Sequence, residues 1–592
     1  MKKLIAIILC LAIAGTACVC SFSASAAQKE KTKEELIEDG AKKGKFLSWL
    51  VGDVLIGTIG KMLPNLSFVH EDSDTFDDEG FYAGNTFIST NTDNYTWKLG
   101  YDKQSIIPDD FGTPLKYARG SYCPWGYSTD YYTDDEGNKE TMNVRTVLLD
   151  DGTGRGLVAI CAVDCIGISN VDVRKIREGV ADFAAEKNIV AIEISAIHSH
   201  MAIDTQGVWG SPLTTAFHNF LSLTGLVKPK SGVNQDYLNT IIDRTATSIK
   251  NAYSNMKEGK LSYTNIELED YFHTRTVSHE CDEDMHKLMF VPDDGSKGTM
   301  ICSFGVHPEL TSYGAEFNAN LSSDFVYYMD KLSALDGKNF MYIQGNVGTN
   351  GPGTGKSSDG LDLANNHEKA IRYGYELAYI ALGASMSTEE RIALNDKLGD
   401  KLGVNTYGGN EGYTPWYEDL PTFEEIPLEA VMNVRNKQVK LEMDNTTAIV
   451  LIKLGLASNY ISYNKSEKKY YTVTEIGYLQ LGSAFKAFMS PGELYSELYV
   501  GGYGLEESSI KSLRETYGDD VILFDLVNDA AGYVCPDETY GIMTYRWDEQ
   551  SQSIYDDAWC MTVSIGSKTA STLINGYADL MSEAMADIPV MR

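Results

Sequence analysis

Residues 188–200 read NIVAIEISAIHSH, a nearly continuous apolar run that ends in two histidines. Apolar runs of this length, bounded by turn residues, are typical of strands in a largely buried sheet. The run therefore predicts a strand over Ile189–Ile197. Because residues two apart in an extended chain point the same way, His198 and His200 can face one site beyond the end of that strand.

The same pattern recurs along the chain. Further strands are predicted at Gly156–Ile166, Met300–Val306, Phe340–Gln344, Ala484–Met489 and Val521–Leu526. Helical periodicity is present at Val171–Glu186, Tyr237–Glu258, Ser323–Leu335 and Asn365–Leu382. Buried strands that alternate with helices predict an α/β fold, with a mixed or parallel, largely buried sheet covered by helices.

Polar side chains follow several of these strands. His307 comes after the strand at 300–306, Glu493 after the strand at 484–489, and Tyr533 after the strand at 521–526, while Asp164 lies near the end of the strand at 156–166. Ligands of open α/β sheets bind just beyond the carboxyl ends of strands. Histidine and carboxylate ligands with an open position form the catalytic zinc pattern, whereas an oxygen-only calcium site would not use the histidines. We therefore predict a zinc site at the carboxyl ends of the strands.

The composition limits the partners. The chain has 592 residues, with 50 Lys and Arg against 83 Asp and Glu, which gives a net charge of −33. A hydrophobic content of 43% is typical of a globular protein. The acidity argues against a nucleic-acid partner, because each phosphate contact needs a cation.

The N-terminal region predicts export. Lys2 and Lys3 precede an apolar run over Leu4–Val19, and the small residues Ala24–Ala27 follow. This pattern indicates a secretory signal peptide over residues 1–26 and a secreted or cell-surface protein, with a lipoprotein as the alternative. Residues 27–94 are predicted to form a helical and acidic extension. Within it, 46–63 (FLSWLVGDVLIGTIGKML) is expected to be a helix packed on the body of the protein or lying on a membrane surface.

Several segments together resemble the neutral/alkaline, non-lysosomal ceramidase family. ISAIHSHMAIDTQG resembles that family's A-T-H-T-H-S-G-P-G-G, and GVHPEL followed by LSSDF resembles its second histidine segment and later S-x-D. YIQGNVGTNGPG resembles Q-G-x-x-G-D-V-S-P-N, SPGELYSEL resembles P-G-E-F/L-x-x-x-x-G, and NDAAGYVCPDETYGIMTYRW resembles N-x-Y-x-G-Y-x-T-x-E-E-Y followed by a second Tyr. The segments occur in the family's order, from about Tyr95 to Tyr577.

The resemblance implies a zinc hydrolase domain over residues 95–592, without the C-terminal β-sandwich of the family. It implies cleavage of the amide of ceramide or a related N-acyl lipid to a fatty acid and an amine. It assigns zinc to His198, His307, Glu493 and Tyr533, and catalytic roles beside the metal to His200, Arg275 and Tyr545.

Two departures from the family's pattern concern the substrate. Thr349 and Gly351 stand where the family has Asp and Ser, so no hydroxyl replaces that serine, and residues 202–205 replace its G-P-G-G. We expect these changes to slow the reaction or to alter the substrate. Two alternatives remain, namely a zinc amidase or esterase for another acyl substrate, and a catalytically silent protein that binds lipid or glycan. The sequence does not predict the oligomeric state.

Overall fold

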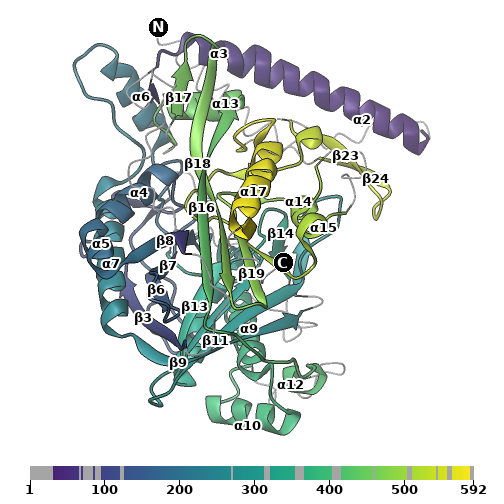
Figure 1. Cartoon of the computed structure of the whole chain (residues 1–592). Helices are drawn as coiled ribbons and strands as arrows, with labels where there is room; N and C mark the ends of the chain where they lie inside the picture. Colours follow the sequence, from purple (N-terminus) through teal and green to yellow (C-terminus); the bar gives the residue numbers. More distant parts are fainter. Residues whose placement is uncertain are drawn as a thin grey trace.

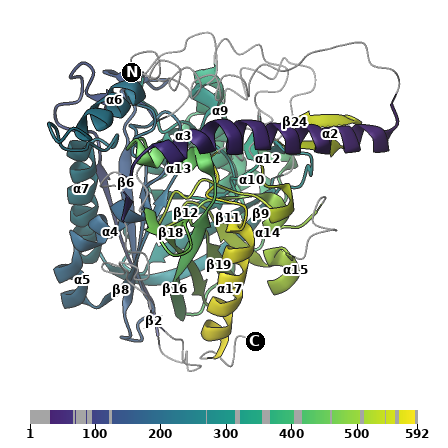
Figure 2. The ribbon, with the colours of Figure 1, turned by 90° about the horizontal axis from the view of Figure 1, so that it is seen from above.

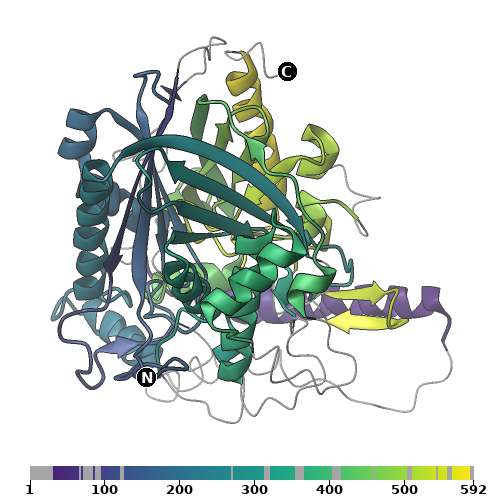
Figure 3. The same cartoon turned by 90° about the horizontal axis from the view of Figure 1, so that it is seen from below.

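The computed structural model describes residues 31–65, 69–70, 85–86, 95–120, 126–268, 271–312, 320–353, 366–402, 415–457, 461–502, 510–541, 544–556 and 563–586. Two mixed β-sheets lie between outer helices (Figures 1 and 3). The predicted signal peptide over residues 1–26 lies outside the described residues.

The first sheet has nine strands in the order β13-β12-β11-β9-β3-β6-β7-β8, with β15 paired to β9. The pairs β7–β8 and β12–β13 are parallel and the other pairs are antiparallel. The strands are β3 (Trp97–Ser105), β6 (Asn143–Asp150), β7 (Leu157–Val163), β8 (Ile189–Ala196), β9 (Lys257–Glu267), β11 (Asp284–Pro292), β12 (Thr299–Phe304), β13 (Asn339–Gln344) and β15 (Ile426–Pro427).

The second sheet has seven strands. β16 (Met432–Met443) and β18 (Lys469–Leu481) form its long antiparallel centre, and β19 (Phe485–Met489) pairs with β18 on one side and in parallel with β21 (Val521–Phe524) on the other. The remaining strands are β1 (Val69–His70), β2 (Asn85–Thr86) and β17 (Ile461–Asn464).

Three hydrophobic cores bind these layers. The largest contains residues from both sheets, such as Phe304 and Leu479, together with α8 (Phe325–Leu335) and α9 (Asn366–Gly383). The second lies under α17 (Thr569–Ala586), which packs on β16 and β18. The third lies under α4 (Asn170–Glu178) and α7 (Gln235–Ser254), on the outer face of the first sheet. The predicted fold class, a mixed α/β fold with buried strands covered by helices, is confirmed.

The predicted strands and helices occur within a few residues of their expected bounds. One predicted helix, Val171–Glu186, is divided into α4 and α5 (Ala181–Lys187), because Val180 leaves the helical conformation at φ −127° and ψ 6°. The shorter elements are β4 (Tyr117–Ala118), β5 (Tyr127–Ser128), β10 (Phe272–Thr274), β14 (Asn350–Pro352), β20 (Glu493–Leu494), β22 (Tyr533–Val534), β23 (Tyr545–Asp548), β24 (Ser553–Asp556), α6 (Pro212–Ser222), α10 (Thr388–Leu398), α12 (Trp416–Asp419), α13 (Thr446–Lys453), α14 (Ser496–Tyr499), α15 (Leu513–Tyr517), η2 (Leu310–Ser312) and η4 (Asp537–Thr539).

The N-terminal segment is helical over α2 (Lys33–Leu47), the π-helix η1 (Ser48–Ile56) and α3 (Gly57–Met62). Its last part packs on α13, where Lys453 donates to the carbonyls of Gly60 and Leu63 at 2.9 and 3.1 Å. The helix predicted at 46–63 is therefore present and in contact with the body. Among the described helices, none is both long enough and apolar enough to cross a bilayer.

The two edges of the first sheet approach each other. β8 and β13 lie at opposite ends of the strand order, yet they are in contact. The segment after β21 joins them, since the Asp525 amide donates to the Gln344 carbonyl at 3.0 Å and the Ala196 amide donates to the Leu526 carbonyl at 3.1 Å. The carboxyl ends of β8 and β12 and the segment after β21 are thereby brought to one place.

Candidate functional site

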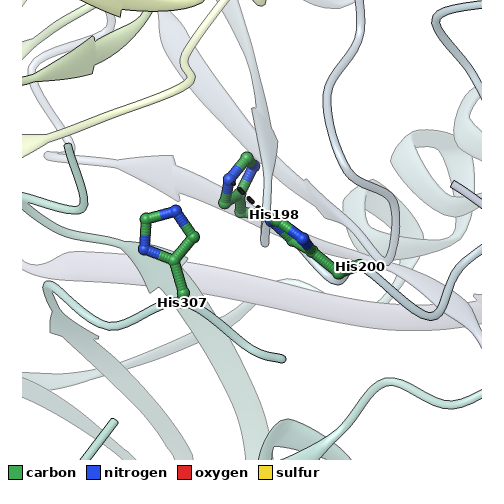
Figure 4. Close-up of side chains that lie close together, drawn as sticks. All are labelled: His198, His200 and His307. Carbon is green, nitrogen blue, oxygen red and sulfur yellow. Dashed lines mark hydrogen bonds between the residues drawn. The ribbon is translucent and has the colours of Figure 1, made fainter. Parts of the chain in front are cut away.

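Three buried histidines converge where the sheet edges meet (Figure 4). His198 and His200 follow β8, and His307 follows β12. The Nε2 atoms of His198 and His200 are 3.1 Å apart. The His307 ring centroid lies 4.8 Å from that of His198 and 5.5 Å from that of His200. The structure thus brings together the three histidines that the sequence placed after two separate strands.

The local backbone differs from the extended chain expected after β8. His198 has a φ of +67°, in the left-handed region that non-glycine residues seldom occupy. The flanking amides of Ile197 and Ser199 donate to the carbonyls of Val163 and Cys165, at 3.1 and 3.2 Å. These bonds hold the turn, and the rings of His198 and His200 meet edge to face at 85° instead of projecting in parallel.

Glu493 completes the centre of the cluster. Its Oε2 lies 3.4 Å from Nε2 of His198 and 3.4 Å from Nε2 of His307. β20 carries Glu493 and pairs in parallel with β22, with Glu493 directly opposite Tyr533. Opposite residues of neighbouring strands point to the same face, so Tyr533, which is only 7% exposed, projects to the same side as Glu493.

The hydrogen bonds of the histidines fit a metal site. Nδ1 of His198 lies 2.6 Å from the Ile166 carbonyl, and Nδ1 of His307 lies 2.6 Å from the Asn350 carbonyl. A carbonyl accepts only from N–H, so the proton of each neutral ring is on Nδ1 and Nε2 keeps its lone pair. Among the described residues, neither His307 Nε2 nor Glu493 Oε2 has a hydrogen-bond partner, although both atoms are buried. A cation between them would satisfy both atoms, and a set of imidazoles and one carboxylate is suited to zinc.

The protonation states agree with this assignment. Burial lowers the pKa of His307 to about 4, against the smaller opposing effect of Glu493. Burial, with the neighbouring His198 and His307, also lowers the pKa of His200 well below its usual value. Burial alone would raise the pKa of Glu493, but His198 and His307 hold it well below its usual range. At neutral pH His307 is neutral and Glu493 is an anion, as metal ligands must be, and the neighbouring His200 is neutral as well.

A buried ion pair lies beside the histidines. Arg275 forms an ion pair with Glu309, whose side chain is fully buried, and the other Glu309 oxygen lies 3.8 Å from Nδ1 of His200. The sequence had placed Arg275 near the site but had not selected Glu309. The feature of the sequence that could have pointed to Glu309 is its position two residues after His307.

Gly351 lies against the same arginine. β14 pairs with β10, which sets Gly351 opposite His273. A Cβ atom on Gly351 would lie 2.7 Å from both Nε and Nη2 of Arg275. The guanidinium therefore occupies the space that a serine side chain would need. The Thr349 hydroxyl does not fill that role, since it bonds Ser496 Oγ at 2.7 Å.

Two other residues from the sequence lie in different surroundings. Tyr545 lies in the hairpin β23–β24 beside α2, with the Lys43 ammonium 4.2 Å from its ring centroid. No contact between Tyr545 and the histidines occurs within the described ranges. Asp164 is buried in an ion pair with Arg145 at 2.6 Å, so its carboxylate belongs to the core and not to the histidine cluster.

A second group of potential metal ligands consists of Asp282, Asp284 and His286. Asp282 forms an ion pair with Arg514 at 2.9 Å and accepts a hydrogen bond from Tyr499 at 3.2 Å. Its charge is therefore already balanced by a cation, which makes this group a weaker metal site than the histidine cluster.

Comparison with solved structures identifies the fold. This chain is similar to the crystal structure of the neutral ceramidase from Pseudomonas aeruginosa, with a TM-score of 0.53 and 15% sequence identity. The match covers 84% of this chain and 75% of the ceramidase chain. The chain has a ceramidase-like fold. A second structure, described as ceramidase complexed with C2, is similar with a TM-score of 0.51 and 14% identity. That match covers 83% of this chain and 75% of the second chain. No protein-family model and no curated protein matches the sequence.

Proposed function

We propose that this protein is a zinc-dependent amidohydrolase that cleaves the amide of ceramide or a related N-acyl lipid into a fatty acid and an amine. The observation that carries the proposal is the buried convergence of His198, His307 and Glu493, with His307 Nε2 and Glu493 Oε2 lacking hydrogen-bond partners among the described residues. The ceramidase-like fold and the motif resemblance support the substrate class.

The ligand set is His198, His307, Glu493 and Tyr533. A zinc ion held there would polarise the acyl carbonyl and lower the pKa of a water molecule. In the overall reaction the water oxygen bonds to the acyl carbon, the carbon–nitrogen bond breaks, and a proton passes to the departing amine. The products are a carboxylic acid and a free amine.

The neighbouring side chains provide proton transfer and charge stabilisation. His200 is neutral at neutral pH and can accept a proton, and Glu309 lies 3.8 Å from its Nδ1, where it would stabilise the imidazolium. Arg275 reaches the space above Gly351, where it presents N–H donors to a developing oxyanion in place of a serine hydroxyl. The catalytic role that the motif resemblance implies for Tyr545 requires the hairpin β23–β24 to approach the site.

The second candidate is a zinc amidase or esterase for a different acyl substrate. The observation that favours it is the loop around Gly351, where Arg275 fills the position of the family's serine side chain. We also propose export of the protein, which the basic and apolar pattern of residues 1–26 supports.

The test combines metal analysis with product release. Purified protein should contain about one zinc per chain and release fatty acid from at least one member of a panel of ceramides and N-acyl amino acids. The His307→Ala variant should lose zinc, because a catalytic zinc has few protein ligands to spare. His218→Ala is the matched control for zinc content, since His218 lies on α6 and bonds the Lys228 carbonyl, away from the histidine cluster. A His307→Ala protein with full zinc and full activity would remove this site, and zinc-loaded protein without any turnover would favour a silent binding protein.

A further inference from the structure

Helix α6 and the loop after it expose a stripe of large apolar side chains. Phe217, Phe220, Leu223 and Leu226 are 53%, 38%, 44% and 82% exposed. They recur every three residues, so those on the helix lie near one another on one face. Single exposed apolar residues are ordinary, but four in one short segment mark an interaction surface.

The same segment has an unusual charge. Residues 205–235 contain no Asp or Glu, in a chain that has 83 acidic residues among 592. At that frequency about four acidic residues would be expected in a stretch of this length. The two charged residues present, Lys228 and Lys230, are basic and exposed beside the apolar stripe. This segment therefore carries a net charge of +2 in a protein with a net charge of −33.

The N-terminal helices carry a second patch of the same kind. Trp49, Val54, Leu55 and Met62 are 52%, 37%, 39% and 67% exposed. Residues 41–63 contain four lysines and one aspartate, a net charge of +3. Apolar and aromatic side chains flanked by lysines are the pattern of segments that lie in a lipid interface.

The two segments that carry these patches are linked through the end of α13. The side-chain amide of Asn219, on α6, donates to the Leu454 carbonyl at 2.7 Å, just after α13. The neighbouring Lys453 donates to the Gly60 carbonyl of α3 at 2.9 Å. Both α6 and α3 lie at the upper end of the molecule in Figure 1 and face the viewer in Figure 2.

We infer that α6, the loop at 223–230 and the η1–α3 segment together form a docking surface for an anionic lipid bilayer. The apolar side chains would enter the interface while the lysines contact anionic headgroups. An anionic bilayer complements the lysines of this surface, whereas a second copy docked through the same face would bring like charges together. The inference concerns binding and does not depend on the proposed amide hydrolysis.

The experiment is cosedimentation of the purified protein with vesicles of phosphatidylcholine, with or without phosphatidylglycerol. We expect binding to the mixed vesicles that weakens with added salt. Lys228→Gln with Lys230→Gln should weaken it roughly 25-fold, since each basic residue near an anionic surface contributes roughly fivefold. Phe217→Ser with Leu226→Ser should abolish it. Leu335→Ser is the matched control, because Leu335 is 51% exposed on α8 and should leave binding unchanged.

A second readout guards against misfolding of the variants. Brominated lipids should quench the fluorescence of the wild-type protein more than that of Trp49→Phe, because Trp49 is placed in the interface. Equal binding by all variants and by Leu335→Ser would overturn the inference. Self-association that the Phe217→Ser and Leu226→Ser changes abolish, without vesicle binding by the wild type, would overturn it in favour of a second copy of this chain.

Discussion

Removing Arg275 should destabilise the protein, and removing Glu309 together with Arg275 should restore much of the loss. Glu309 is fully buried, and Arg275 is 15% exposed and forms an ion pair with it. The Arg275→Ala variant leaves a buried carboxylate without its cation, and truncating one partner of a buried pair costs about 3–5 kcal/mol. The partial exposure of Arg275 places the expected loss at the lower end, about 3 kcal/mol.

The magnitude can be followed by thermal unfolding. With an unfolding entropy of about 2.1 cal/mol/K per residue, a chain of this size loses about 2.4 °C in Tm for a loss of about 3 kcal/mol. The double variant Arg275→Ala with Glu309→Gln removes the buried charge and should regain at least half of that loss. The exposed surface pair Lys469–Glu442, at 2.8 Å, is the control, and Lys469→Ala should leave Tm nearly unchanged.

The reasoning would be refuted if the two substitutions had additive effects on stability. If Glu309→Gln adds its own loss to that of Arg275→Ala, the two side chains are not coupled and the charge argument is wrong. The double variant should also remain slow in amide hydrolysis although it is stable. That separation would show that the Arg275–Glu309 pair acts in the reaction and not only in folding.

Three further predictions concern the histidine cluster and its loop. His200→Ala should lower turnover about 10²–10⁴-fold while zinc content, measured by metal analysis, stays near that of the wild type; an equal loss of both would make His200 a ligand. Gly351→Ser and Gly351→Ala should both lower kcat, because a Cβ there would lie 2.7 Å from Arg275 Nε, and a serine variant faster than the wild type would contradict that placement. The zinc-free protein should lose stability as pH falls from about 6.5 to about 4, since His307 has a pKa of about 4 when folded and a higher one when unfolded. The slope is about 1.4 kcal/mol per pH unit, and a Tm that does not change with pH in the zinc-free wild type would argue against a buried neutral His307.

The apolar pattern of the sequence predicts the strands that are buried on both faces, but it does not predict the strands that are partly exposed. Strands such as β8 and β12 are buried on both faces, and their continuous apolar sequence makes them visible. The long antiparallel strands β16 and β18 were not predicted. β16 reads MNVRNKQVKLEM, with charged side chains on its more exposed positions, and such a strand has a weaker signal in a single sequence.

The site shows the same division. His198, His200, His307 and Glu493 were recognised because they follow predicted strands, and Tyr533 was selected as a ligand through motif resemblance. Glu309 was missed because its role depends on Arg275, which lies on a separate segment of the chain. The occupied space at Gly351 was also beyond the sequence, because it results from the pairing of β10 with β14.

The proposed ligands come from both sheets, and this has a consequence for assembly. His198 and His307 follow strands of the first sheet, whereas Glu493 and Tyr533 lie on β20 and β22, which follow β19 and β21 of the second. The segment after β21 bonds both β8 and β13, so the same backbone that joins the sheets also fixes the distance between their ligands. A metal bound by both sets would stabilise the joined state over the separated one. Zinc affinity should therefore depend on the packing between the sheets as much as on the ligands themselves.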